Sequence, residues 1–522
     1  MSAPANPADE KPVTIAAWLG FLAMCVGMFM AILDIQVVAA SLPDMATALN
    51  IPQDKLSWIQ TSYLIAEIIA IPLTAFLTRA MSVRWLFAGS TLAFTIASIG
   101  CAMSNDFVSL ITLRTIQGFC GGALIPAVFT SIFVLFPSKR EAVATTIAGT
   151  FAMIAPTIGP ALGGWLTQTY SWHAIFLVNV VPGLIVTAMV ARLVRVGEPD
   201  WKLLKQIDYV TIALSAIFLG SLELALKEAP KYHWHGTYID IILAVCLVSG
   251  AAAFHQCLTR PAPFVDLRRF KERSFMIGCV LSFTLGMGLF GASYLTPVFL
   301  GFVRGHTPIE IGEVMIVAGV AQLFAAPIAA FLETRVDARI IAVCGFALFA
   351  AGLALNGFET PRSDYAFFFW PQVIRGMAIM LCLLPATRLA LDGAPQDKLA
   401  DASALFNLMR NLGGAIAIAL VDTIVEQRTE GHVNKIVDLL KAGNAHTARF
   451  VGLPLQYFHN RAEGPVDAFT KMLIEPLVKK AGITQSFNEA WLMLAVLFAL
   501  ALFTIPFIRN AIAKRTSITD GL

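Results

Sequence analysis

Charged residues are scarce in this chain. They make up 14% of its 522 residues, whereas soluble globular domains carry about a quarter. Hydrophobic residues make up 57%, and apolar runs of about 20 residues, long enough to cross a bilayer as helices, recur along nearly the whole chain. These properties exclude an ordinary soluble domain and predict an all-α polytopic membrane protein.

Motifs for several other chemistries are absent. The chain has no G-x-x-x-x-G-K-[ST] phosphate loop, so ATP hydrolysis in this chain is not the energy source. Its eight cysteines lie in apolar runs without a C-x-x-C pair, so neither a disulfide framework nor a zinc site is indicated. The polar start "MSAPANPADEKPV" lacks the features of a cleaved signal peptide. We therefore expect no catalytic residues, no cofactor and no metal.

Hydropathy predicts fourteen membrane-spanning helices. They cover about residues 16–42, 56–78, 86–103, 108–136, 143–166, 172–191, 207–227, 236–258, 274–301, 308–332, 340–358, 366–391, 400–425 and 486–508. With a cytoplasmic N-terminus, the cytoplasmic segments hold 20 lysines and arginines and the short loops opposite hold 5. The positive-inside rule therefore places both termini in the cytoplasm and the long segment 426–485 outside.

The chain also repeats itself. The stretch "IPLTAFLTRAMSVRWL" (71–86) resembles "APIAAFLETRVDARII" (326–341), and "IQG" (116–118) matches "IRG" (374–376), at offsets of 255 and 258 residues. Two related halves with a site between them are a common plan of secondary transporters, although chance similarity between apolar segments is the alternative. The predicted units are a cytoplasmic tail (1–15), an N-terminal six-helix half (16–195), two inserted helices (196–273) and a C-terminal six-helix half (274–522).

Five motifs carry a family resemblance that runs from about residue 18 to the C-terminus. The sequence resembles the fourteen-helix drug:proton antiporters of the major facilitator superfamily, EmrB/QacA type, and "GPxxGG" in the fifth helix is specific to exporters of this superfamily. The motifs are "LDIQVVAASLP" (33–43), "LITLRTIQGFCGGAL" (110–124), "APTIGPALGGWL" (155–166), "SWHAIFLVNVVPG" (171–183) and "RNLGGAIAIAL" (410–420).

The sequence departs from the family pattern at two places. In the loop after the second helix, usually G-x-L-a-D-r-x-G-r, Ala75 replaces the first glycine, Arg79 the acid and Ser82 the second glycine. In that family the acid helps the loop to hold the two halves in one state. In the first-helix motif, Gln36 and Ala39 replace the usual threonine and asparagine.

The resemblance implies a proton-coupled multidrug exporter that works by alternating access in the bacterial inner membrane. Its expected partners are drug-like small molecules, protons and lipid, and no nucleic acid. It also implies a tripartite system with an EmrA-like membrane-fusion adaptor and a TolC-like outer-membrane channel. Two alternatives remain: a proton-coupled uptake permease for a small metabolite, against which the glycines of the fifth helix argue, and a membrane enzyme or receptor, for which no constellation of residues is found.

Asp34 stands in the apolar run "MFMAILDIQVVAASLP" (28–43). An ionised aspartate at the centre of a spanning helix costs about 3 kcal/mol on insertion scales, unless it faces a wet cavity or takes up a proton. Burial disfavours the charged form of a carboxyl group. We therefore predict that Asp34 couples transport to protons, and the matching family position is an acid. The alternative is a structural hydrogen bond to a neighbouring helix.

Glu67 belongs to a polar stripe on the second helix. Gln60, Tyr63, Glu67 and Thr74 lie three, four and seven residues apart, and therefore on one face that must contact protein or water. Glu67 is predicted as a second proton site or an attractor of cationic substrates, with a structural role as the alternative.

Three arginines, Arg114, Arg375 and Arg410, lie in apolar helices. Because a lipid-facing guanidinium is expensive, we expect all three to face inward. Arg114 matches an arginine of the family that is proposed to relay protons beside the first-helix acid, so we assign proton coupling to Asp34, Glu67 and Arg114. A static ion pair is the alternative for Arg114.

The remaining expected site residues fall into two groups. Polar residues predicted to line the substrate cavity are Gln36, Gln60, Tyr63, Glu67, Gln117, Asn407 and Arg410. Residues predicted to serve gating and close helix packing are Arg79, Arg84, Pro156, Gly159, Pro160, Gly163, Gly164 and Arg375.

The external segment 426–485 is the remaining feature. Val433, Ile436, Val437 and Leu440 form an amphipathic stripe, and "VDAFTKMLIEPL" is expected to form a second short helix. In the resembled pumps an adaptor docks on this region; the alternative is a lid over the protein's own mouth.

Overall fold

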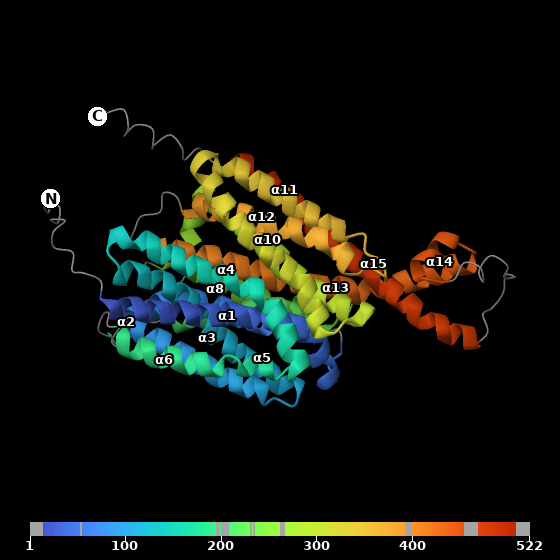
Figure 1. The fold of residues 1–522 in the computed structure, drawn as a ribbon, viewed down its shortest axis with the longest axis horizontal. Helices are drawn as coiled ribbons and strands as arrows, with labels where there is room; N and C mark the ends of the chain where they lie inside the picture. The colour runs from blue at the N-terminus through green and yellow to red at the C-terminus, as the bar shows by residue number, and fades with distance from the viewer. Residues whose placement is uncertain are drawn as a thin grey trace.

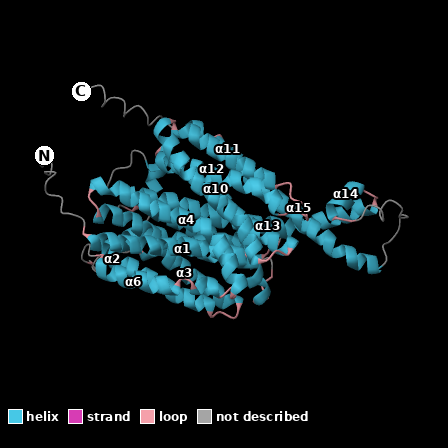
Figure 2. Cartoon of the chain, in the orientation of Figure 1, coloured by secondary structure: helices cyan, strands magenta, loops and turns pink. Residues whose placement is uncertain are grey.

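The computed structural model describes residues 14–52, 55–194, 208–229, 235–260, 267–391, 399–453 and 468–507, together with the single residues 199 and 232. This part of the chain consists of helices and their connections and contains no strand (Figure 2). The prediction of an all-α fold is confirmed.

The helices follow one another closely along the chain, and most are long enough to cross a bilayer. Their bounds are α1 (Ile15–Ala48), α2 (Trp58–Ala102), α3 (Phe107–Leu135), α4 (Ser138–Thr169), α5 (Ala174–Leu177), α6 (Val180–Leu193), α7 (Tyr209–Glu228), α8 (Thr237–Thr259), α9 (Arg273–Phe299), α10 (Pro308–Arg335), α11 (Ala338–Asn356), α12 (Tyr365–Leu391), α13 (Leu399–Lys441), α14 (Ala445–Val451) and α15 (Ala468–Leu502). A π-helical turn, Leu300–Arg304, continues α9.

The described residues contain 11 helices that are long and apolar enough to cross a membrane, or 12 when the bent pair within α4 counts as one span. Two shorter apolar helices, Trp58–Ile71 and Tyr209–Leu222, lie where the sequence predicts the second and seventh spans. The structure is therefore consistent with fourteen spans.

Two groups of helices face each other across the long axis of the molecule (Figure 1). The N-terminal group includes α1, α2, α3 and α6, and the C-terminal group includes α10, α11 and α12. The groups meet where α4 packs on α10, α2 on α13 and α1 on α9, while α7 and α8 pack mainly on each other. This arrangement is the predicted fold of two six-helix halves with two inserted helices.

Two breaks interrupt the helices, one between two predicted spans and one within a predicted span. Predicted spans two and three are joined in α2 by a sharp break at Ser82, which has φ 65° and ψ 153°. A non-glycine residue with these backbone angles is strained by about 1–3 kcal/mol of free energy. This strain explains why the resembled family has glycine at this position. The sixth span is divided into α5 and α6, and Asn179 caps the second part.

The helices on either side of α14 extend beyond the apolar runs. The predicted stripe on α13 is confirmed, because Ile436 packs with Val451 of α14 and Val478 of α15. The expectation of a separate short helix in "VDAFTKMLIEPL" is wrong: its residues from Ala468 onward form the first turns of α15. Hydropathy marks only the apolar part of a helix, whereas backbone hydrogen bonding continues into its polar end. The outer part of α13, α14 and the first turns of α15 form a projection from the bundle. In Figure 1 this projection lies at the end of the bundle opposite the start of α1.

Candidate functional site

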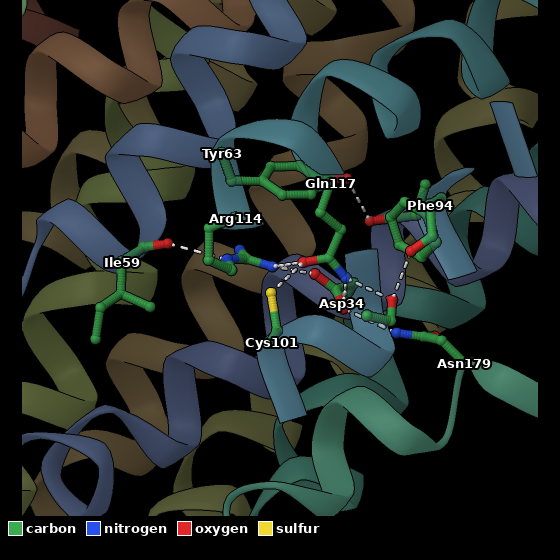
Figure 3. A network of polar contacts seen from close by, with 10 residues as sticks. Asp34, Ile59, Tyr63, Phe94, Cys101, Arg114, Gln117 and Asn179 are labelled. Atoms are coloured by element: carbon green, nitrogen blue, oxygen red, sulfur yellow. Dashed lines mark hydrogen bonds and ion pairs between the residues drawn. The ribbon is translucent and has the colours of Figure 1, made fainter. Parts of the chain in front are cut away.

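Asp34 is the centre of a buried polar network in the N-terminal half. Its side chain is fully buried in α1, and Arg114 of α3 forms an ion pair with its Oδ2 atom. The Oδ1 atom accepts hydrogen bonds from Gln117 Nε2 at 2.9 Å and from Asn179 Nδ2 at 2.8 Å. Three side chains, two from α3 and one from the break between α5 and α6, therefore converge on one carboxylate (Figure 3).

The guanidinium of Arg114 binds several acceptors at once. Its Nη1 also donates to Gln117 Oε1 at 2.7 Å, and its Nε donates to the carbonyl oxygen of Ile59 at 3.1 Å. The ring of Tyr63 lies against it, with 4.5 Å from Cζ to the ring centroid. The Nη2 atom has no hydrogen-bond partner, so part of this buried cation is available to a further acceptor.

Two members of this network had no role in the sequence-based prediction. Asn179 stands at the break between α5 and α6, where its side chain points at Asp34. Ser98 of α2 accepts a hydrogen bond from Gln117 Nε2 at 2.8 Å. A polar residue inside an apolar run was the available signal for both. Gln117, expected in the substrate cavity, is fully buried and donates a hydrogen bond to Asp34.

The Asp34–Arg114 pair is a fully buried ion pair. Breaking a buried pair by removing one charge costs about 3–5 kcal/mol, because the other charge is left uncompensated. A proton on Asp34 removes its negative charge without changing any atom of the backbone. Proton binding therefore changes the balance of forces among α1, α3 and the α5–α6 break.

Glu67 lies where the two halves meet. Its side chain is 2% exposed, and it has a hydrogen bond with Asn411 and lies near Arg410, both of α13. Its Oε2 atom has no partner. Arg410 in turn donates to Asn407 Oδ1 at 2.7 Å. The structure thus brings three of the expected cavity residues, Glu67, Asn407 and Arg410, to one contact between the halves.

The other expected cavity residues lie close to this contact or to Asp34. Gln60 and Tyr63 are buried on the same face of α2 as Glu67 and Thr74, so the predicted polar stripe faces protein. The Tyr63 hydroxyl donates to the carbonyl oxygen of Ala31 at 3.3 Å. Gln36 of α1 faces α4, next to Gly159.

The arginines expected to serve gating and packing are dispersed. The side chain of Arg79 lies outside the described residues. Arg84 follows the break at Ser82 and lies 4.8 Å from the centroid of the Trp85 ring. Arg375 is 4% exposed in α12 and donates to Gln372 Oε1 at 2.6 Å. The prediction that Arg114 and Arg375 face inward agrees with this burial.

The glycines of α4 pack against two different helices. A Cβ atom at Gly163 would lie 2.4 Å from the carbonyl oxygen of Val37 in α1, and one at Gly159 would lie 2.5 Å from Gln36 Cβ. Gly164 faces the other half: its Cβ would lie 2.1 Å from the carbonyl oxygen of Pro308 in α10. Only glycine permits these backbone approaches. Pro156 and Pro160 lie inside the same helix, which is bent by 46° between Pro156 and Ile158.

Comparison with known protein families agrees with this architecture. The protein family described as "Major Facilitator Superfamily" matches residues 24–418 of this chain. The chain belongs to the Major Facilitator Superfamily. Within this superfamily it is similar to the "Colistin resistance protein EmrB" of Acinetobacter baumannii, with 37% identity over 94% of this chain and 96% of that protein. It is also similar to the "Multidrug export protein EmrB" of Escherichia coli K12, with 30% identity over 93% of this chain and 94% of that protein.

Solved structures of other transporters share the fold. A bacterial homologue of the human lysosomal transporter Spinster, in an inward-facing and unoccupied conformation, has a TM-score of 0.62 at 14% identity, covering 96% of this chain and all of that one. The nucleoside transporter NupG has a TM-score of 0.58 at 13% identity, with coverage of 94% and 100%. At these identities the likeness supports the fold alone. The predicted EmrB/QacA resemblance is confirmed by the sequence relatives.

The contact between α4 and α10 gives a test of close packing in this superfamily member. Gly164→Ala places a methyl group against the Pro308 carbonyl, and overpacking of this kind costs about 1–3 kcal/mol. If transport requires this contact, we expect the efflux rate to fall by roughly tenfold. Gly149→Ala in the same helix is the matched control, because no atom lies within 4 Å of the added methyl group. Equal efflux by the two variants, at equal amounts in the membrane, contradicts the packing argument.

Proposed function

We propose that the protein is a proton-coupled multidrug exporter that moves amphiphilic or hydrophobic toxic compounds out of the cell by alternating access. One observation carries this proposal: a fully buried carboxylate in the first span forms an ion pair with a buried arginine. The names of the relatives, "Multidrug export protein EmrB" and "Colistin resistance protein EmrB", support export as the direction and drug-like molecules as the cargo.

Asp34 and Arg114 supply the coupling in this proposal. A proton from the outside binds Asp34 and cancels its charge, so Arg114 loses its strongest partner and α3 can move relative to α1. Release of the proton to the cytoplasm restores the pair. Substrate enters the cavity from the cytoplasm when Asp34 gives up its proton, and it leaves to the outside when a new proton binds. Inward movement of protons therefore drives outward movement of substrate. The ligand must bind the two states with different affinities for this coupling to work.

Substrate contacts are assigned to the interface of the halves. Glu67 and Arg410 place opposite charges near each other there, and Asn407 and Asn411 add amide groups on α13. Such a site accepts amphiphilic molecules, and the carboxylate of Glu67 favours cationic ones. Glu67 is the second proton site in the proposal. Gln36, Gln60 and Tyr63 complete the set on α1 and α2.

Uptake of a small metabolite is the second candidate function. The "GPxxGG" segment of α4 argues against it, because the resemblance ties this signature to exporters. Gly163 and Gly164 in that segment make the backbone approaches to α1 and α10.

The proposed location is the bacterial inner membrane, with both termini in the cytoplasm. The projection of α13, α14 and α15 then lies in the periplasm, where an EmrA-like adaptor joined to a TolC-like channel would dock. The positive-inside distribution supports this orientation, and the projection lies at the end opposite the start of α1 (Figure 1).

Cysteine labelling tests this topology. In a background without native cysteines, we expect Gly443→Cys, at the turn after α13, to react with a membrane-impermeant maleimide in intact spheroplasts. Ser517→Cys should react only after permeabilisation, which serves as the control for reactivity. Labelling of Ser517→Cys but not of Gly443→Cys in intact spheroplasts reverses the proposed orientation.

The proposed function is tested by flux in proteoliposomes. The purified protein is reconstituted with a fluorescent lipophilic cation inside or outside the vesicles, and a pH gradient of either sign is imposed. We expect dye to move against its own gradient in the direction opposite to the protons, and dissipation of the pH gradient to stop this movement. Movement of dye in the same direction as the protons supports the permease instead.

A further inference from the structure

Another buried acid lies in the C-terminal half, in the loop 357–364 between α11 and α12. Glu359 stands three residues beyond Asn356, the last residue of α11, yet only 1% of its surface is exposed. No hydrogen bond of good geometry reaches either of its carboxyl oxygens. Loop acids normally stay in water, because burial of an unpaired carboxylate is expensive. A buried acid here therefore requires an explanation.

The backbone of Glu359 is held in place by α15. Its amide nitrogen donates to Asn488 Oδ1 at 3.0 Å, and its carbonyl oxygen accepts from Asn488 Nδ2 at 2.9 Å. This double contact involves no atom of the Glu359 side chain. The carboxyl group is thus directed into the protein by its backbone, and a change of that group need not disturb the loop.

Two large side chains face the carboxyl group. Trp491 of α15 acts on it as a hydrogen-bond donor and Arg375 of α12 through its charge, and the Arg375 Cζ atom lies 5.0 Å from the centroid of the Trp491 ring. Arg375 is committed to Gln372 through Nη2, while its Nε and Nη1 atoms have no partner. An acid without a hydrogen bond of good geometry and a guanidinium with free donors therefore stand beside each other.

The next acid along α15, Glu489, already has ion-pair partners. Glu489, the neighbour of Asn488, faces α13, where Arg428 Nε binds it at 2.8 Å and His432 Nε2 at 3.1 Å. Burial raises the pKa of the Glu359 carboxyl well above its usual range, although Trp491 and Arg375 lower it. The carboxyl group accordingly holds its proton at pH values where an exposed glutamate is ionised.

The internal repeat relates this cluster to the Asp34 network. The offset of 258 residues places Cys101, Arg114 and Gln117 of the first half on Glu359, Gln372 and Arg375 of the second. Each half has an arginine and a glutamine three residues apart, joined by a hydrogen bond of 2.7 Å in α3 and 2.6 Å in α12, but in opposite order. The reversed order moves the guanidinium to the side where Glu359 replaces Cys101.

We propose that Glu359 and Arg375 form a further proton-binding site, located in the C-terminal half and loaded from the face on which α14 projects. The loop that carries Glu359 reaches this face, because Arg362 donates to the carbonyl oxygen of Gly452 beside α14 at 3.0 Å. A proton from water on this face forms an O–H bond with one carboxyl oxygen. It leaves to water when α11, α12 and α15 rearrange and the free nitrogens of Arg375 bind the carboxylate.

This inference rests on the proposed proton coupling, so its test measures the number of protons exchanged for each substrate. Proteoliposomes are given a fixed pH gradient, and the concentration gradient of a lipophilic cationic dye is varied. The dye gradient at which net dye flux is zero gives the ratio of protons to dye molecules exchanged. We expect Glu359→Gln to transport with a ratio lower by one proton than the wild type. Asp364→Asn, which removes a half-exposed acid of the same loop, is the matched control and should keep the wild-type ratio.

A double variant separates a proton site from a structural partner. Arg375 is the group that binds the Glu359 carboxylate in the proposal, so Glu359→Gln/Arg375→Met removes both members of the site and should accumulate well in the membrane. If Glu359 binds a transported proton, the double variant keeps the lowered ratio. Recovery of the wild-type ratio, or an unchanged ratio in the single variant, overturns the proposal.

Infrared spectroscopy of the purified protein gives a reading that does not depend on transport. We expect the wild type to show a protonated-carboxyl C=O band at neutral pH that is weaker in Glu359→Gln. An identical band in both proteins overturns the inference even if transport is proton-coupled. If the wild type shows the band but no flux responds to a pH gradient, the proposed function fails and the protonated Glu359 remains.

Discussion

Asp34→Asn is expected to reduce efflux driven by a pH gradient to the level of cells that lack the protein. Asparagine keeps the size of the side chain and an oxygen that accepts hydrogen bonds from Gln117 and Asn179, but it cannot exchange a proton. Substrate binding and substrate–substrate exchange should persist, because they require the cavity and not the proton. Dye accumulation in energised cells and exchange in proteoliposomes measure the two activities separately.

The control for this variant is its amount and monodispersity after purification. Asn removes the charge opposite Arg114, and an uncompensated buried charge is destabilising by about 3–5 kcal/mol. Asp34→Asn/Arg114→Met removes both charges and should recover stability without recovering proton-driven efflux. Proton-driven efflux at the wild-type rate in either variant makes the Asp34 carboxylate structural.

Arg114→Ala is the second variant from which we expect complete loss of proton-driven efflux, and it should also lower the melting temperature. It removes the ion pair with Asp34 together with the hydrogen bonds to Gln117 and Ile59. Arg114→Lys should rescue transport poorly. A lysine keeps the charge, but a single nitrogen cannot reproduce contacts that come from two nitrogens of a planar group.

A double-mutant cycle between positions 34 and 114 measures this coupling directly. Residues in one buried network show interaction energies of about 0.5–3 kcal/mol, so the losses of stability in Asp34→Asn and Arg114→Ala should not add. Additive losses, or a fully active alanine variant, would assign Arg114 to ordinary helix packing.

The sequence contained most of the information about spans and buried charges. Asp34, Glu67 and Arg114 were recognised because a charge is rare and costly in an apolar run, and each proves to be buried. The ends of α13 and α15 were missed because their outer turns are polar, so hydropathy stops before the helix does.

Partners of these charges were harder to predict. The sequence does not show that Gln117 binds Asp34, because the face of α3 that carries Gln117 is known only after the helices are packed. Asn179 binds Asp34 because it stands at the break between α5 and α6. No local sequence pattern predicts this break. Glu359 lies in a loop, where an acid is ordinary; its burial depends on Asn488, more than a hundred residues later.

Substrate-induced proton release from the purified protein tests the central claim most directly. A weakly buffered solution with a pH indicator receives a lipophilic cationic substrate, and both proteins carry Glu67→Gln and Glu359→Gln so that neither of the other two buried acids contributes. Protein with Asp34 should release a proton when substrate binds, and the release should vanish at a pH high enough to ionise Asp34 beforehand. Protein with Asp34→Asn should bind the same substrate and release no proton. Equal release from the two proteins contradicts the assignment of the coupled proton to Asp34.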